Sequence, residues 1–231
     1  MTAGLKTIFK NFFAAIQDHL ELLVMANVGW FALVAPFILL EVYSFYFAKG
    51  NILTAVLSLA AFLVIPAATA ALFYLVRTML IEPDAGFKDF IFGLKKYFLK
   101  SLWLCLLDIL LMVILAVNLV FYLKLFPGLS GSFKYFILVI LGLVVWFLLF
   151  LLLSQIYLFP VLVARDVSIF AVFKTAFILV LNNLWLNVII LSALVLMTVL
   201  WIISGLGILC FLGSTTAILQ TITLQELTKE T

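Results

Sequence analysis

Residues 62–103 read FLVIPAATAALFYLVRTMLIEPDAGFKDFIFGLKKYFLKSLW. The segment starts inside an apolar run that ends at Arg77, and a short polar turn follows at 82–84. Residues 86–100 then place apolar side chains on one stripe and basic ones on the other, which is typical of an amphipathic helix at a membrane surface. From Trp103 the chain is apolar again. The segment therefore predicts a membrane-spanning helix, a helix along the surface, and a second membrane-spanning helix.

The composition of the whole chain agrees with this prediction. Of the 231 residues, 68% are hydrophobic and 10% are charged, and the mean hydropathy is +1.40. Soluble domains carry about 25% charged residues, so this chain has too few charges to cover a surface that faces water. Apolar runs of about 20 residues recur, and each is long enough to cross a hydrocarbon core of about 30 Å. We predict an all-α polytopic membrane helix bundle, formed by a single transmembrane domain over residues 1–231.

The apolar runs predict about six spans. They cover residues 22–42, 52–76, 101–123, 135–163, 178–203 and 206–225. The fourth is longer than a bilayer requires, so we expect it to tilt or to kink at Pro160. The sixth is rich in Ser and Thr. It either spans inside the bundle with its hydroxyls bonded to backbone or neighbours, or it is a re-entrant or water-lining helix. Amphipathic interfacial helices are predicted at 4–20, 86–100 and 166–177.

The predicted pieces follow one another in the same order three times. Each candidate repeat, 4–77, 86–165 and 168–225, holds an amphipathic helix, an outgoing span and a returning span. Such units would all enter the membrane from one side, which makes them parallel repeats. Any six-span protein alternates in this way, so a true repeat and simple alternation both remain open.

The basic residues predict the orientation. If both termini share one side, ten of the thirteen Lys and Arg residues lie there, and only Lys49, Lys124 and Lys134 lie on the other side. The ten are Lys6, Lys10, Arg77, Lys88, Lys95, Lys96, Lys100, Arg165, Lys174 and Lys229. Basic residues accumulate on the cytoplasmic side of a membrane. We therefore expect both termini, and the interfacial helices, to be cytoplasmic.

Asp108 is the sharpest candidate for chemistry inside the membrane. It lies about 12 Å along a helix from Lys100, below the headgroups. A carboxylate at that depth is costly unless it is paired, protonated or facing a polar interior. It could serve as a proton or cation relay or as a substrate contact, or it could simply hold two helices together. Arg77 and Arg165 are its candidate partners.

Two further groups of residues suggest contacts between helices. Asn183 and Asn187 lie one helical turn apart and could line a polar interior for a neutral, hydroxyl-rich substrate. Alternatively they make interhelical hydrogen bonds, each worth about 0.6 kcal/mol. Small residues let another backbone approach closely. The candidate packing face consists of Pro66, Ala67, Ala70 and Ala71.

Motifs for catalysis or cofactor binding are missing from the sequence. It has no HExxH, GxSxG or P-loop pattern, and the predicted cytoplasmic loops are too short for a nucleotide site. Cys105 and Cys210 both lie in apolar runs without metal-ligand spacing. We expect no enzyme activity, no cofactor, no metal and no nucleic-acid partner. A lipid-modifying enzyme is kept only as a remote alternative.

Several short motifs resemble a known family. They are PAATAALFY (66–74) with Arg77, then Phe87, Phe90 and Trp103, together with Asn27, Trp30 and Pro36, then Phe159-Pro160 with Arg165, and Asn183 with Trp185. In this order, over nearly the whole chain, they are similar to the YesL-like family of bacterial integral membrane proteins. The chain departs from the family pattern just before Pro66, where it reads AFLVI (61–65).

The resemblance implies a location and a process but no site residues. It implies a multi-pass protein of the bacterial cytoplasmic membrane. Members of the family are of uncharacterised function and are often encoded beside carbohydrate ABC transporters. The first hypothesis is therefore a non-enzymatic accessory of carbohydrate uptake that packs against a transporter's membrane subunits, with Pro66–Ala71 as its docking surface. The alternative is a small permease in its own right that uses Asp108 and the amides of the fifth span.

Overall fold

The computed structural model describes residues 2–47, 52–128 and 131–229, which are almost entirely helical. The elements are α1 (Thr2–Asp18), α2 (Leu20–Phe47), α3 (Ile52–Met79), α4 (Phe87–Leu125), the 3₁₀ turn η1 (Phe126–Gly128), α5 (Ser132–Arg165), α6 (Ile169–Asn182), α7 (Leu184–Ser204), α8 (Leu206–Cys210) and α9 (Leu212–Lys229). No strand occurs in these described ranges. The predicted all-α class is confirmed.

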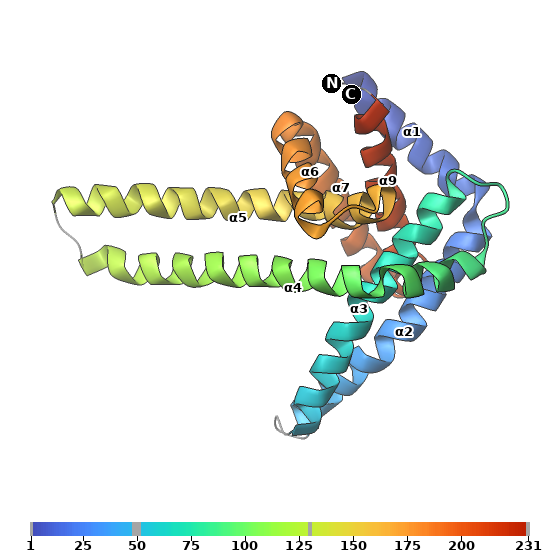
Figure 1. The fold of residues 1–231 in the computed structure, drawn as a ribbon, viewed down its shortest axis with the longest axis horizontal. Coiled ribbons are helices and arrows are strands. Elements are labelled where there is room, and N and C mark those ends of the chain that lie inside the picture. The colour runs from blue at the N-terminus through green and yellow to red at the C-terminus, as the bar shows by residue number, and fades with distance from the viewer. Residues whose placement is uncertain (1, 48–51, 129–130, 230–231) are drawn as a thin grey trace.

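The molecule consists of a compact head from which long helix pairs extend (Figure 1). We call residues 105–125 of α4 and 132–149 of α5 the α4–α5 arm; these two segments lie side by side and point away from the head. The pair α2–α3 extends in a different direction. The first and last helices, α1 and α9, lie next to each other in the head, where Asn11 of α1 donates a hydrogen bond to the Glu226 carboxylate of α9 at 3.2 Å.

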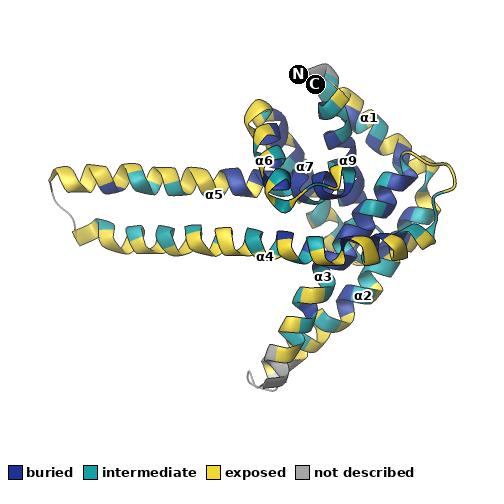
Figure 2. Cartoon of the chain, in the orientation of Figure 1, coloured by how far each residue is buried: buried dark blue, intermediate teal, exposed yellow. Residues whose placement is uncertain are grey.

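Within the described residues, five helices are long and apolar enough to cross a membrane. They are Leu20–Tyr43, Val56–Met79, Phe87–Gly128, Ser132–Arg165 and Leu184–Ser204. Figure 2 shows that the far parts of the long helices are mostly exposed, whereas the buried residues gather in the head. Exposed apolar surface on this scale is stable against hydrocarbon and not against water. The chain is a multi-pass helical membrane protein that contacts lipid.

The predicted sixth span, 206–225, is not one helix. Gly205 has a φ of +66°, which favours glycine, and the helix is interrupted again at Phe211 between α8 and α9. The following helix, α9, lies in the centre of the head and is mostly buried (Figure 2). Its hydroxyls bond to its own backbone, as one of the two interpretations expected: Thr221 donates to the carbonyl of Ala217 at 2.7 Å.

The predicted surface helix at 86–100 is not a separate element. It continues through Trp103 into the third span, so that α4 is one helix of 39 residues, or roughly 58 Å. The prediction of a bend was wrong because no proline interrupts this segment. Gly93, the glycine in this segment, does not end the helix. A Cβ there would lie 2.8 Å from the Cβ of Tyr74, so glycine allows α4 to approach α3 closely.

Two further features differ from the predictions. Part of the apolar face of α1 packs inside the chain and not on lipid, because Ile8, Phe12 and Ala15 are buried and α1 packs on α9. The fifth span begins at Leu184 and not at 178, since α6 runs on to Asn182. The three candidate repeats correspond to α1–α3, α4–α5 and α6–α9, and their common origin stays a prediction.

Candidate intramembrane polar site

Asp108 is paired across the base of the α4–α5 arm. The Nε2 group of Gln155 on α5 donates to its Oδ1 at 2.8 Å. Asp108 is half-buried. The arginine partners predicted for it were wrong, because Arg77 binds elsewhere and Arg165 is exposed at the end of α5. The arrangement can hold α4 against α5, with one carboxylate oxygen accepting from a neutral amide.

Arg77 takes part in a cluster that closes the C-terminal end of α5. Its Nη1 donates to the carbonyl of Val163 at 3.3 Å, and the Tyr97 hydroxyl donates to the same carbonyl at 3.3 Å. The last carbonyls of a helix lack intrahelical partners and carry partial negative charge. An arginine from α3 and a tyrosine from α4 therefore stabilise this end and join three helices.

A second contact follows immediately after α5. Asp166 has a φ of 50°, a left-handed conformation that Asp tolerates better than most residues. Its carboxylate lies 2.5 Å from the Nζ of Lys100 and 3.3 Å from that of Lys96. The hydrogen bond from Lys100, with a second from Lys96, lowers the pKa of Asp166. Sequence reasoning missed this contact, because residues 66 positions apart give no local signal.

Asn187 stabilises the break between α6 and α7. It is fully buried, and its Oδ1 accepts a hydrogen bond from the Tyr157 hydroxyl of α5. Its Nδ2 donates to the carbonyls of Leu179 and Val180, at 3.4 and 3.3 Å. These carbonyls lose their usual partners where the helix stops at Asn183. The side chain of Asn183 also donates to Leu179, at 3.4 Å.

Asn27 plays the same part at the break between α8 and α9. Its Nδ2 donates to the carbonyls of Ile208 and Leu209, at 2.9 and 2.7 Å. Its Oδ1 accepts from the amides of Gly213 and Ser214, at 2.6 and 3.0 Å. Irregular backbone inside a membrane protein must find such partners. In the sequence, this role of Asn27 is indicated only by the glycines around the break and by the presence of an asparagine within a span.

The predicted polar residues do not converge on one site. Gln155 and Tyr157, which bind Asp108 and Asn187, stand two positions apart on α5 and so do not share a face. The contact of Arg77 at Val163 is about 12 Å further along the same helix than Gln155. Among the described residues, every buried side-chain nitrogen or oxygen atom has a hydrogen-bond partner. These polar groups connect helices at separate places.

The small-residue face of α3 lies inside the head. Pro66, Ala67, Ala70 and Ala71 are all buried, and α3 packs against α2, α4, α5 and α9. The face is therefore not exposed to a transporter, and its proposed use as a docking surface was wrong. Small side chains here let neighbouring helices of the same chain approach.

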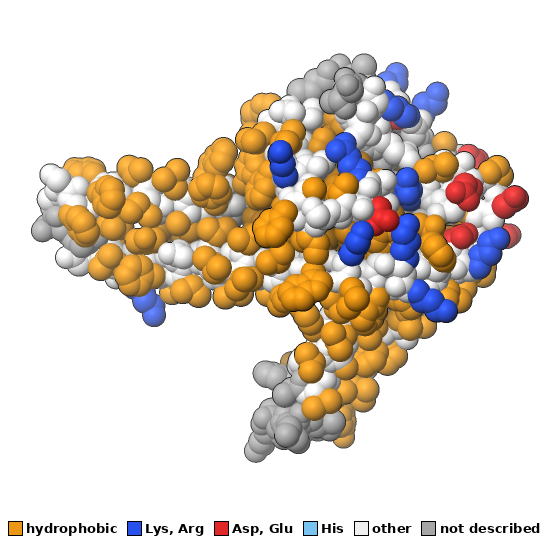
Figure 3. Space-filling view, viewed as in Figure 1, with side chains coloured by type: hydrophobic (Ala, Val, Ile, Leu, Met, Phe, Trp, Pro, Cys, Tyr) orange, Lys and Arg blue, Asp and Glu red, His pale blue; other side chains and the backbone are white. Residues whose placement is uncertain are grey.

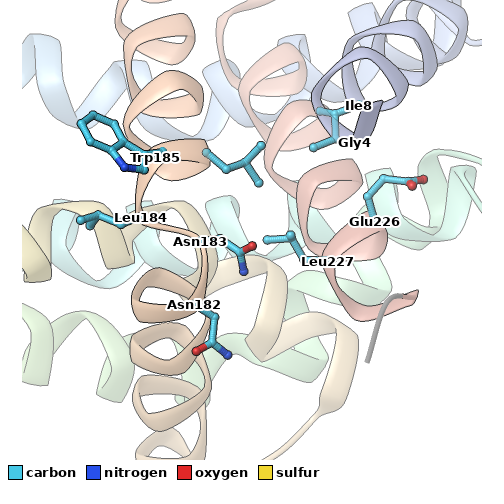
Figure 4. A pocket seen from close by; sticks show the side chains of 9 residues that line it. Gly4, Ile8, Asn182, Asn183, Leu184, Trp185, Glu226 and Leu227 are labelled. Atoms are coloured by element: carbon cyan, nitrogen blue, oxygen red, sulfur yellow. The ribbon is translucent and has the colours of Figure 1, made fainter. Parts of the chain in front are cut away.

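One cavity in the head combines polar and apolar side chains. It has a volume of about 300 Å³ and lies between α1, the α6–α7 break and the end of α9. Figure 4 shows Asn182 and Asn183 on one side of it and Glu226 on another. Within the described ranges, no group of three His, Cys, Asp or Glu residues could hold a metal ion.

Comparisons of the chain with protein-family models, with curated proteins and with solved structures find no match. The function is therefore argued from the residues and their arrangement.

Proposed function

We propose that this chain is a non-enzymatic accessory of carbohydrate uptake in the bacterial cytoplasmic membrane. It docks through its α4–α5 arm on the membrane subunits of an ABC-type transporter. The carbohydrate part of the proposal rests on the resemblance to the YesL-like family. The docking part rests on the arm.

The single observation that carries the proposal is the isolation of the α4–α5 arm. Apart from Ile137, none of the described residues of the arm is buried. The arm and the α2–α3 pair diverge from the head, so none of the other described helices lies beside the outer half of the arm (Figure 1). A lone helix pair offers apolar surface on nearly every side. Membrane helices associate by close van der Waals packing, and such a surface suits the spans of a second protein.

The distribution of charge supports cytoplasmic termini. Lysines and arginines gather on the head, over α4, α6 and the end of α5 (Figure 3). Lys124 and Lys134 lie at the far end of the arm, while Lys49 falls outside the described residues. An excess of basic residues on one side favours that side as the cytoplasmic one.

A permease acting alone is the second candidate function. Asp108 favours it, as an ionisable group at the depth of the membrane with one neutral partner. Asp108 and Asn187 bind Gln155 and Tyr157, which lie on different faces of α5, and this separation makes the permease the weaker candidate. An Asp108→Asn variant separates the two functions, because a permease loses flux in liposomes whereas an accessory still associates with its partner.

The test of the accessory function is mild affinity purification from native membranes, followed by mass spectrometry. We expect the membrane subunits of a carbohydrate ABC transporter at near-stoichiometric abundance. Val117→Trp and Val139→Trp place bulk on exposed positions of the arm, and we expect either to reduce the amount of transporter recovered.

The matched control is Leu59→Trp, at an exposed position of the α2–α3 pair. It should leave recovery unchanged. A protein that purifies alone in every case contradicts stable docking. Equal losses in the arm variants and in Leu59→Trp contradict the arm as the docking surface.

A further inference from the structure

The head also contains an apolar groove. The groove has a volume of about 580 Å³ and lies between α1 and α7, and Phe211 and Thr215 also line it. Six of its residues are aromatic or leucine side chains that face it from both walls, namely Phe9, Phe12, Phe13, Leu196, Leu200 and Trp201. No polar surface lines it.

The cavity and the groove follow one another along the same three helices. Along α1 the lining passes from Gly4 and Ile8 at the cavity to Phe9–Ile16 at the groove. Along α7 it passes from 184–186 to 193–201, and along α9, in the reverse direction, from 226–227 to 215. The cavity is the polar member of the pair and the groove is the apolar one. The stretch of α7 that borders both, from Leu184 to Trp201, measures about 25 Å, close to the thickness of one leaflet with its headgroups.

We propose that the cavity and the groove together hold one phospholipid with an ammonium-bearing headgroup, placed at Asn182, Asn183 and Glu226, with an acyl chain between α1 and α7. A polar cavity and an apolar groove along the same helices suit an amphiphile. The groove is continuous with the exposed face of α7, a membrane-crossing helix, so an acyl chain reaches it from the bilayer.

The charge at the cavity selects the headgroup. Glu226 is the ionisable residue among those that line the cavity. Among the described residues, Asn11 donates a hydrogen bond to its Oε1, and Lys229 forms an ion pair with the same atom at 3.0 Å. Its Oε2 is left to accept from a ligand, and the Asn182 amide likewise has no bonded partner in the described part of the chain. A carboxylate favours a primary ammonium, as in phosphatidylethanolamine, over the glycerol headgroup of an anionic lipid.

Native mass spectrometry of the full chain in mild detergent tests this proposal. The protein is first delipidated and then mixed with phosphatidylethanolamine or phosphatidylglycerol. We expect one phosphatidylethanolamine to be retained under activation that removes the rest. Ala193→Trp fills the groove and should lower retention about tenfold. Glu226→Gln should remove the preference for phosphatidylethanolamine while leaving an acyl chain bound.

Leu196→Trp repeats the test at the exposed mouth of the groove, in case Ala193→Trp prevents folding. Ile203→Trp is the control, because Ile203 lies on α7 beyond the groove and is 77% exposed. Equal retention in the groove variants and in Ile203→Trp overturns the acyl-chain site. A preference for phosphatidylglycerol, unchanged in Glu226→Gln, overturns the headgroup assignment. Neither result depends on the docking proposed above.

Discussion

Helix α9 and the α4–α5 arm relate polarity to burial in opposite ways. The buried helix contains Ser214, Thr215, Thr221 and Thr223, all nearly inaccessible. In the most apolar 18-residue window of the Phe87–Gly128 segment, only 6% of residues are buried. In a water-soluble protein the more polar helix would be the outer one. Here the solvent of the arm is hydrocarbon, so the most apolar segment is the outer one.

The comparison shows how polar groups are tolerated in the core. The hydroxyls of α9 bond to carbonyls one turn back in the same helix, as Thr223 does to Leu219 at 2.7 Å. The breaks in the head are closed by Asn27 and Asn187. The stability of the core therefore depends on satisfied hydrogen bonds and close packing, whereas the stability of the arm in the membrane depends on its length and apolar surface. Matched substitutions in the two regions should have different effects.

The largest difference in stability between core and arm variants is expected when an asparagine is replaced by leucine. Asn27→Leu removes four hydrogen bonds and leaves backbone groups at the α8–α9 break unpaired. The free energy of unfolding in detergent should fall by about 3 kcal/mol or more. Asn118→Leu on the arm loses a bond only to Ile114, of its own helix, and should cost little. Denaturant unfolding followed by circular dichroism measures both, and equal effects would contradict the comparison.

The next largest difference in stability is expected when a small side chain is enlarged. Ala70 is completely buried among neighbouring helices, so Ala70→Phe should destabilise the protein by about 2 kcal/mol through overpacking. Ala116 is exposed on the arm, and Ala116→Phe should be close to neutral. The same unfolding measurement applies. A neutral Ala70→Phe would mean that the α3 face is not packed as described.

A smaller difference is expected for a single hydroxyl. Tyr157→Phe removes the donor to Asn187 and should cost about 1 kcal/mol. The hydroxyl of Tyr122, on the arm, makes no hydrogen bond within the described part of the chain, and Tyr122→Phe should leave stability unchanged. If both variants unfold like the native chain, the Tyr157 hydroxyl does not stabilise the α6–α7 break.

The smallest effect is expected at the surface of the head. The folded-state pKa of Asp166 is below its usual value of 3.8 because of Lys100 and Lys96. Its contribution is therefore complete above about pH 4 and is lost as pH falls through the lowered pKa. The pair is exposed, so Asp166→Asn should cost about 0.5 kcal/mol at pH 7, and this cost should shrink as the pH falls through the lowered pKa. A cost that does not change with pH would indicate a different role for this residue.

The spans were predictable because they depend on a local property. A run of apolar residues that ends at an arginine is visible in the sequence, and α5 does end at Arg165. The sequence also predicted the excessive length of the fourth span. These features require no knowledge of which helices are neighbours.

The corrected features all depend on neighbours. Whether the apolar face of α1 meets lipid or α9 is not encoded in its spacing. A change from amphipathic to apolar pattern near Trp103 suggested a bend, but a helix without proline can keep its hydrogen bonds through such a change. The roles of Asn27 and Asn187 depend on breaks in distant helices. Their polarity was visible in the sequence, but their partners were not.

The most direct test of the division into core and arm uses a leucine-sized side chain that carries a photoreactive diazirine. It is placed at Leu219 in α9, which is 0% exposed, or at Leu143 in the arm, which is 54% exposed. After irradiation in native membranes, Leu219 should form crosslinks only within the chain, and Leu143 should form them with lipid and with a second protein. Crosslinks from Leu219 to lipid, or from Leu143 only within the chain, would contradict the division.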